Sequence, residues 1–545
     1  MKINFKNKLF IFSIIFILTS FLINILKIGI ISDYEYVYNL DSFLIERQLT
    51  VYEFFWNSIN IYNSSRITPL GNIIQIIVSQ FNFLFFFKVF HFLILVIFFF
   101  IFFLFIKKFF SKFFAFLSIL LCLIFFQFTE YLDPFIAWPE GVFFVTFLLI
   151  GTIMISYKIC VLKKVNLIIF SFLILLNLFY AEVTVFFIPI ILLSLIYNLS
   201  FETIKKKRIY FFILFLILSF YFMVFINFYF YSSIDIYPGA QISISLKESF
   251  GTFFLHILRT IPLTWLFVTD KFSFFIKYFL SNISFFYFLI FFLYLFCISS
   301  VLKNLNKPKN LINHQFFYII GIYLILFPPF LMSISKRYSF QIFEHGFGHA
   351  HHIVVYQYIG AILLIICLLS RFNKFLKNNL LRNFISIFLS FIFLINYSLA
   401  NYTASRLEPH RNLYPYLIFE NFLRNDVTKD IQTVIILEKE NYGFWTHKQF
   451  FQTNLSRKIK NTFTDFWLAE KDKRLKDVAI DEGDNYLIIK KLDFSNPRKL
   501  ILEGCIDKLE NKFDKWQDCK GNFIYEEQRR LIYYIKSRKL EFLKS

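Results

Sequence analysis

Two carboxylates, Asp33 and Glu35, stand one residue apart directly after the first long apolar run of the chain. One carboxylate at such a position can act as a general base toward an attacking hydroxyl, while the other binds substrate or a metal ion. The same stretch, SDYEYVYNLD, contains Ser32-x-x-Glu35, which matches a capping box at the start of a helix. General-base chemistry and helix capping therefore both remain open for this pair.

Basic residues near the ends of other apolar runs suit phosphate chemistry. Arginine binds a phosphate through paired hydrogen bonds, and lysine does so as a point charge. The alternative role for each is that of an anchor that extends to the lipid headgroups. The substrate-binding candidates among them, all at predicted outward or interfacial positions, are Arg66, Arg259, Lys336 and Arg337.

Two further acidic residues are candidates for substrate binding. Glu140 follows Pro139 in TEYLDPFIAWPEG, where this pair also suits the first turn of a helix. Glu182 lies between two apolar runs with almost no loop. An ionisable residue near the bilayer interface is a functional candidate by default, and a solvated turn is the alternative.

Four of the nine histidines lie in the stretch EHGFGHAHH. Glu344, His345 and His349 are candidate ligands for a divalent metal, because carboxylate and imidazole suit Zn²⁺ or Mn²⁺. The two glycines in this stretch argue against a helix that would fix the ligand spacing. Contact of His345 and His349 with a donor phosphate or an acceptor is the alternative, and no cofactor other than such a metal is expected.

The elements that must position these residues are membrane-spanning helices. The 545 residues are 58% hydrophobic and 22% aromatic, with a mean hydropathy of +0.61, which excludes a soluble protein. The pattern predicts a polytopic α-helical membrane protein with about 11 transmembrane helices, each long enough for the bilayer core. These apolar runs lie at 9–31, 84–106, 113–128, 142–157, 165–180, 183–197, 210–231, 284–302, 316–334, 353–369 and 381–399.

The net charge of +21 is explained by topology. Basic clusters fall between alternate pairs of apolar runs, which is the pattern of cytoplasmic loops, and no basic face for a nucleic acid is expected. An odd number of helices then places the N-terminus in the cytoplasm and the C-terminus outside. The long outward loops, above all 32–82, are expected to contain amphipathic helices.

The composition turns polar near residue 401, which predicts two domains, a membrane domain at 1–400 and an extracytoplasmic domain at 401–545. Short β-type runs at 433–437 and 486–492, between helical-looking stretches, predict a small α/β domain there. Cys505 and Cys519 lie in this segment, where an oxidising compartment would allow a disulfide between them.

The triplet Asp33-Tyr34-Glu35, the long loop 32–82, and Arg66 in the stretch SSRITPL resemble the GT-C class of integral membrane glycosyltransferases. The resemblance covers about the first 400 residues in topology, but only these short motifs in detail. It implies transfer of a sugar from a polyprenyl-phosphate donor to a glycan, lipid or protein acceptor, at the outward face of a membrane such as the bacterial inner membrane. It assigns the general base to Asp33, with Glu35 orienting the acceptor or assisting.

Two other functions fit a polytopic protein with this pattern. A transporter, such as a flippase for lipid-linked sugars, needs polar residues or broken helices near the bilayer midplane, whereas the predicted helix centres are apolar. An outer-face glycan polymerase or ligase of another family is the other alternative. No nucleotide-binding loop or nucleophile elbow stands in a suitable context, so the donor must supply the energy of transfer.

Overall fold

The computed structural model describes residues 5–27, 84–128, 164–180, 187–196, 245–264, 272–305, 311–335, 354–372 and 375–406, with residue 266. It also describes shorter pieces within 50–56, 70–73, 143–154 and 208–226, and the strand residues between 433 and 528. The chain divides into two compact units, one of which contains the helices up to Thr403 and the other the strands.

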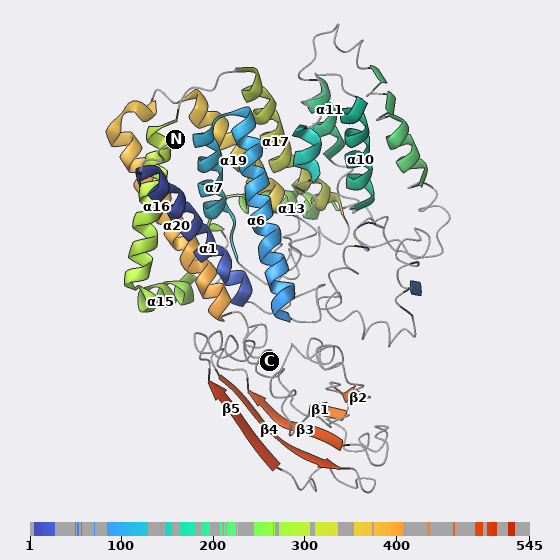
Figure 1. Ribbon diagram of the computed structural model, residues 1–545, viewed down its shortest axis with the longest axis vertical. Coiled ribbons are helices and arrows are strands. Elements are labelled where there is room, and N and C mark those ends of the chain that lie inside the picture. Colours follow the sequence, from blue (N-terminus) through green and yellow to red (C-terminus); the bar gives the residue numbers. More distant parts are fainter. Residues whose placement is uncertain are drawn as a thin grey trace. The chain divides into compact units, whose positions relative to one another are not determined.

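The helical unit is a bundle of long apolar helices (Figure 1). Six helices in the described part of the chain are long and apolar enough to cross a membrane, so this is a membrane protein; three shorter apolar helices accompany them at Lys112–Phe125, Ile168–Leu178 and Phe215–Val224. The six candidate spans coincide with six of the predicted runs, and the total of about eleven stays a prediction. They are Lys8–Leu26, Lys88–Phe109, Phe285–Lys303, Gln315–Ile334, Val354–Arg371 and Asn379–Ala404.

The elements, in chain order, are helices separated by short turns. The principal ones are α1 (Phe5–Leu22, then a 3-10 turn Ile23–Lys27), α6 (Leu84–Phe109), α7 (Lys112–Phe125), α10 (Lys164–Tyr180), α11 (Ile188–Ile196), α13 (Leu246–Leu258), α15 (Phe272–Asn282), α16 (Phe285–Lys303), α17 (Leu311–Ile334), α19 (Val354–Arg371), the 3-10 helix η5 (Phe375–Lys377) and α20 (Asn379–Arg406). Helix α7 contacts α1, α16 and α19.

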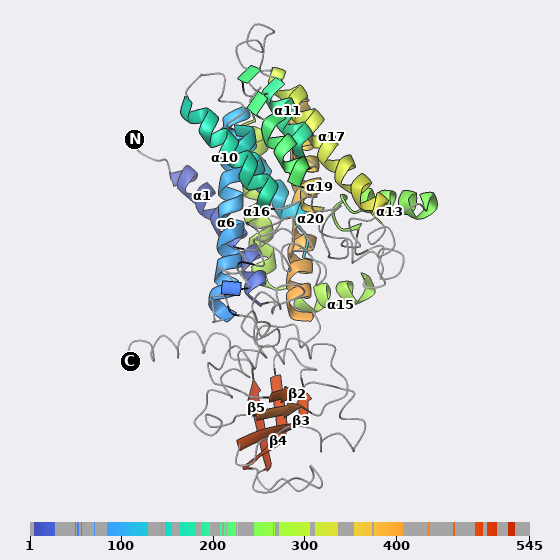
Figure 2. The ribbon, with the colours of Figure 1, turned by 90° about the vertical axis from the view of Figure 1, so that its right-hand side faces the viewer.

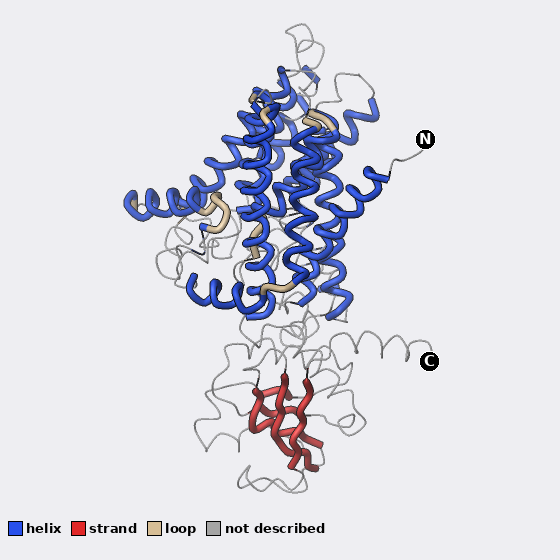
Figure 3. Tube along the Cα trace, turned by 90° about the vertical axis from the view of Figure 1, so that its left-hand side faces the viewer, coloured by secondary structure: helices blue, strands red, loops and turns tan. Residues whose placement is uncertain are grey.

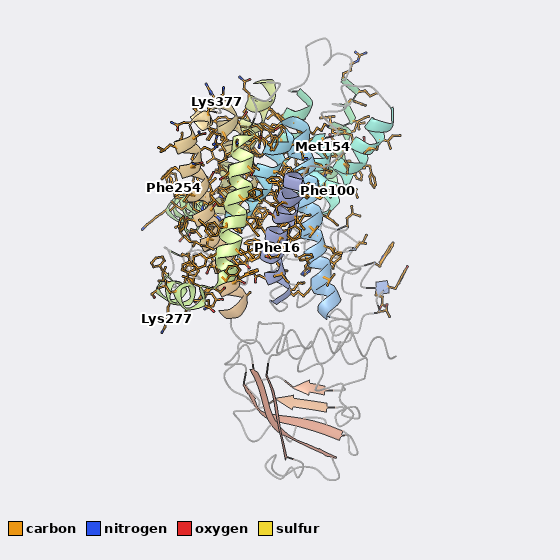
Figure 4. All side chains as sticks on the ribbon, turned by 60° about the vertical axis from the view of Figure 1, so that its left-hand side comes forward. Phe16, Phe100, Met154, Phe254, Lys277 and Lys377 are labelled. Carbon is orange, nitrogen blue, oxygen red and sulfur yellow. The ribbon has the colours of Figure 1, made fainter. Side chains whose placement is uncertain are left out.

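Large aromatic side chains point away from the bundle along the spanning helices. Phe100, for example, is 61% exposed in the middle of α6, and Phe292 and Phe391 are also exposed on α16 and α20 (Figure 4). In a soluble protein such a surface would drive aggregation, whereas lipid tails are a good solvent for it. The abundant phenylalanine therefore serves both the packed core and the lipid-facing surface.

The described basic side chains of the long helices gather at one end of the bundle, which we call the basic end. Lys107 lies in the last turn of α6, Lys303 in that of α16 and Arg371 in that of α19. The joints between α6 and α7, α16 and α17, and α19 and α20 all lie at this end (Figure 1). Lys377 marks the basic end in Figure 4, and Lys277 marks the opposite end. The positive-inside rule predicts that the basic end is cytoplasmic.

Helices α17 and α19 approach each other closely because two glycines face each other in their interface. A Cβ atom on Gly360 would lie only 2.7 Å from the carbonyl oxygen of Gly321, and one on Gly321 would lie 3.0 Å from the carbonyl oxygen of Gly360. Small residues at such a contact let two backbones pack directly, which is a principal source of association between helices in lipid. This contact fixes the position of α19 against α17.

Side chains from two helices hold the end of α7 that lies away from the basic end. The hydroxyl of Tyr294 on α16 donates to the carbonyl of Leu120 at 2.9 Å. The amide of Asn396 on α20 donates to the carbonyls of Leu123 and Phe126 at 2.7 and 2.8 Å. The last carbonyls of a helix lack partners within the helix, and lipid supplies none, so these bonds stabilise the end of α7.

Helices α13 and α15 run across the long axes of α16 and α20 rather than along them (Figures 2 and 3). One apolar cluster joins them to α20. Its buried members are Leu263, Leu266, Phe275 and Leu399, and Tyr402 packs against them. The crosswise helices are thereby attached to the end of α20 that lies away from the basic end.

The second unit contains a five-stranded mixed sheet in the order β2-β1-β3-β4-β5. The strands are β1 (Thr433–Ile436), β2 (Asn461–Phe463), β3 (Asn485–Asp493), β4 (Lys499–Lys508) and β5 (Asn522–Gln528). Strand β1 pairs in parallel with β2 and β3, whereas β3–β4 and β4–β5 are antiparallel. The register of β3 against β4 shifts between Ile489 and Lys491.

Two of these strands, β1 and β3, coincide with the β-type runs at 433–437 and 486–492, which are rich in β-branched residues and leucine. The helices expected in the same segment lie outside the described residues. The small α/β domain therefore stays a prediction in its helical part.

Candidate functional site

Helix α13 has its polarity reversed compared with a surface helix of a soluble protein. Leu246, Phe250, Phe254 and Leu258, spaced four residues apart, form a stripe of exposed apolar side chains, and Leu246 is 86% exposed. Phe254 of this apolar stripe lies at the rim of the helical unit in Figure 4. A helix with such a stripe suits lipid contact on that side.

The opposite face of α13 is polar and buried. Thr252 is fully buried and His256 is 1% exposed, and Arg259, which follows the helix as its C-cap, is 5% exposed. The spacing of three and four residues places the three on one side of the helix. We call Thr252, His256 and Arg259 the polar face. Ionisable side chains inside a lipid-embedded unit are costly and usually functional.

Gln357 on α19 connects this helix to the bundle. Its amide nitrogen donates to the carbonyl oxygen of His256 at 2.8 Å and to the hydroxyl oxygen of Thr260 at 3.0 Å, and its side chain is fully buried. Because a carbonyl can only accept, the amide nitrogen must face His256. The amide oxygen of Gln357 is then left without a hydrogen bond to the described residues.

Gln357 lies in the first turn of α19, and Arg371 lies in its last turn. The polar face therefore stands at the end of the bundle opposite the basic end, which the positive-inside rule predicts to be extracytoplasmic. The close contact between Gly321 and Gly360, one turn along α19 from Gln357, sets the position of this amide.

A tight turn follows the polar face. The amide of Thr264 bonds to the carbonyl of Ile261 at 3.3 Å across Pro262 and Leu263. Leu263 has a φ of 67°, in the left-handed region that favours glycine. A leucine in this conformation costs about 1–3 kcal/mol, and such strain concentrates at functional sites. The buried packing of Leu263 against Phe275 of α15 and Leu399 of α20 holds it there.

Of the residues singled out from the sequence, Arg259 is the one whose side chain the structure describes. Its burial differs from that of a lysine or arginine extended toward lipid headgroups. Cys505 lies in β4, paired with Ile488 of β3 and Asn522 of β5, and Cys519 is outside the described residues, so their disulfide stays a prediction. Also outside them are Asp33, Glu35, Arg66, Glu140, Glu182, Lys336, Arg337, Glu344, His345 and His349.

Sequence reasoning missed the partners of Arg259. His256 is a lone histidine in the sequence, and Gln357 stands in an apolar run as a single polar residue. The spacing of Thr252, His256 and Arg259 on one helix face was a usable signal, because the same segment carries an apolar stripe on the opposite face. The link to Gln357, about 100 residues further along the chain, has no local signal.

The predicted first outer loop contains a described capping box, at Thr50 and Glu53. The carboxylate of Glu53 accepts from the amide and the hydroxyl of Thr50 at 2.8 and 2.9 Å, and the amide of Glu53 donates back to that hydroxyl at 3.1 Å. The hydrogen bonds from Thr50 lower the pKa of this carboxyl below its ordinary value of 4.5. Exposed Tyr52 and Trp56 stand in the helical residues that follow.

Within the described residues, no group of three or more His, Cys, Asp or Glu side chains gathers to hold a metal. The predicted ligands Glu344, His345 and His349 lie outside those residues. Comparison of the sequence with models of known protein families gives no match. Comparison with curated proteins gives no match either.

Proposed function

We propose that this chain is a membrane glycosyltransferase that moves a sugar from a polyprenyl-phosphate-linked donor to a glycan, lipid or protein acceptor. The observation that carries the proposal is the polar face of α13, where Arg259 is buried behind a helix whose other side is apolar and exposed. A lipid phosphate needs a cation beside the bilayer and an apolar surface for its chain. Both lie on this one helix.

Transfer requires two tasks from the protein. A carboxylate, proposed as Asp33 with Glu35 assisting, takes the proton from the acceptor hydroxyl as its oxygen bonds to the anomeric carbon. The bond between that carbon and the phosphate oxygen breaks, and the electron pair leaves with the lipid phosphate. A phosphate leaving group needs little protonation, so charge neutralisation by Arg259 is the larger contribution.

The position of the polar face favours an enzyme over a conduit. A transporter for lipid-linked sugars requires polar groups along a path through the bilayer. The polar face lies at one end of the bundle, held there by Gln357 in the first turn of α19. Chemistry at one membrane surface is the simpler use of such a site.

The test is a transfer assay with the purified full chain in nanodiscs and a polyprenyl-phosphate donor that carries a labelled sugar. Arg259→Met is expected to lower transfer by roughly 10²–10³-fold, the usual effect of removing one preorganised electrostatic contact. Arg259→Lys retains the charge but not the paired geometry and should lose less. The matched control is Lys277→Met, which removes an exposed cation on α15.

Asp33→Asn should abolish transfer while the protein still inserts normally, and Glu35→Gln shows whether Asp33 works alone. Undiminished transfer by Asp33→Asn would remove the base assignment. Movement of the labelled donor across liposomes without any covalent product would contradict the enzyme and favour a flippase.

A further inference from the structure

Two ionisable side chains are buried near the start of α6, far from the motifs on which the proposed function rests. Lys88 and His91 are each 1% exposed and stand one helical turn apart. Lys88 is also the first residue of the candidate span Lys88–Phe109. Lysines at the ends of spans ordinarily extend their ammonium to water or to headgroups, and this one does not.

The charge of Lys88 has no protein counter-ion in the described part of the chain. No hydrogen bond or ion pair joins its ammonium to a described residue. The acidic side chains described in the helical unit are Glu53, whose carboxylate is exposed and bonded to Thr50, and Glu248 in the first turn of α13. An uncompensated buried ammonium is among the costliest groups that a folded protein can hold.

The direction of the side chain adds to this cost. Lys88 is the fifth residue of α6, and side chains of a helix lean toward its N-terminus. The ammonium therefore lies toward the end of the helix that has a partial positive charge. His91 adds a second group able to donate a hydrogen bond on the same side, because it follows Lys88 at a spacing of three. Three features thus favour a negative charge at one place.

We propose that Lys88, with His91, binds a phosphate-type anion at the end of α6 opposite the basic end. Phosphate suits a lysine that acts as a point charge, and the start of a span is the depth at which lipid phosphates lie. The anion is therefore either the headgroup phosphate of a lipid or a free phosphate. The inference rests on these two residues alone, and it stands or fails independently of sugar transfer and of Arg259.

The test uses the purified full chain in dodecyl maltoside, a detergent without phosphate. Thermal unfolding is followed with inorganic phosphate, with a polyprenyl phosphate, and with the matching polyprenol, which has the same chain but no phosphate. The polyprenyl phosphate is expected to raise the Tm in proportion to its concentration, because a ligand that binds the folded state stabilises it. The polyprenol is expected to leave the Tm unchanged. A shift with inorganic phosphate as well would identify free phosphate as a sufficient ligand.

Lys88→Met separates this site from general lipid effects. Without ligand, this variant should unfold at a higher temperature than the wild type, since it removes a buried charge. With the polyprenyl phosphate, its apparent Kd should be weaker by about tenfold or more, the effect of about 1.4 kcal/mol of lost binding. Lys88→Arg should bind, and so should Lys277→Met, which removes an exposed lysine instead.

Three results would overturn the proposal. One is an unchanged Tm of the wild type with both phosphates. Another is a shift of Lys88→Met equal to that of the wild type. The last is an equal shift with polyprenol, which would assign the effect to the apolar chain. If Lys88→Met does not fold, Lys88→Gln is compared with Lys88→Arg, and equal binding by these two would likewise contradict the site.

Discussion

Gly360→Ala tests the contact that positions α19, and its cost follows from the geometry of the interface. The new Cβ would stand 2.7 Å from the carbonyl oxygen of Gly321 and 2.9 Å from the Cβ of Leu324, where ordinary contact begins at 3.4 Å. Neither atom can rotate away. The two helices must therefore separate by about 0.7 Å at this point, enough to weaken the hydrogen bond of Gln357 one turn away.

Overpacking of this kind costs about 1–3 kcal/mol, and the better helix propensity of alanine returns up to about 1 kcal/mol. The expected net loss for Gly360→Ala is about 1–2 kcal/mol. Gly321→Ala should lose less, because its nearest contacts at 2.7 and 2.8 Å are with the side chain of Leu364, which can move. Gly151→Ala is the matched control, since its nearest contact is 3.9 Å away.

The assay is equilibrium unfolding of the full chain in dodecyl maltoside micelles titrated with SDS. Stability is expected to decrease in the order Gly151→Ala, Gly321→Ala, Gly360→Ala, with the Gly151 variant at or above the wild type. If Gly360→Ala is as stable as the wild type, or if Gly151→Ala loses as much, the close approach of α17 and α19 is refuted.

Two further predictions concern named hydrogen bonds. Gln357→Leu removes the bonds to His256 and Thr260 and should cost about 1–2 kcal/mol in the same unfolding assay; an equal loss with Gln315→Leu, at an exposed position of α17, would show that the site is not special. The Glu53 carboxyl should titrate below its ordinary pKa of 4.5, so its bonds to Thr50 persist at neutral pH and are lost as the pH falls through this lowered pKa. Thr50→Ala should return that pKa toward 4.5, measured by NMR on labelled Glu53, and an unchanged pKa would refute the capping box.

The spanning helices were predictable from the sequence because lipid imposes one requirement along a whole run of residues. Runs such as 284–302 and 353–369 coincide with α16 and α19 within a few residues, since every backbone group must be satisfied within the helix. The crosswise orientation of α13 and α15 was not predictable in this way. It depends on packing of Leu263 and Phe275 against Leu399, residues that are far apart in the chain.

The candidate site was predictable only in part, for a similar reason. Arg259 was a candidate because of its charge and its predicted side of the membrane. The burial of Lys88 and the bond from Gln357 to His256 depend on neighbours distant in sequence. A single polar residue in an apolar run has the same local pattern whether it lines a site or caps another helix, so periodicity alone does not separate these roles.

The reversed polarity of α13 is the central claim, because the proposed site depends on it. It is tested most directly by oxygen accessibility of a nitroxide label placed at single cysteines along 250–259, in nanodiscs and in a background without the native cysteines. Lipid-dissolved oxygen should reach labels at 250, 254 and 258 and should be excluded from labels at 252, 256 and 259. High accessibility at 252 and 256, with low accessibility at 250 and 254, would contradict the claim.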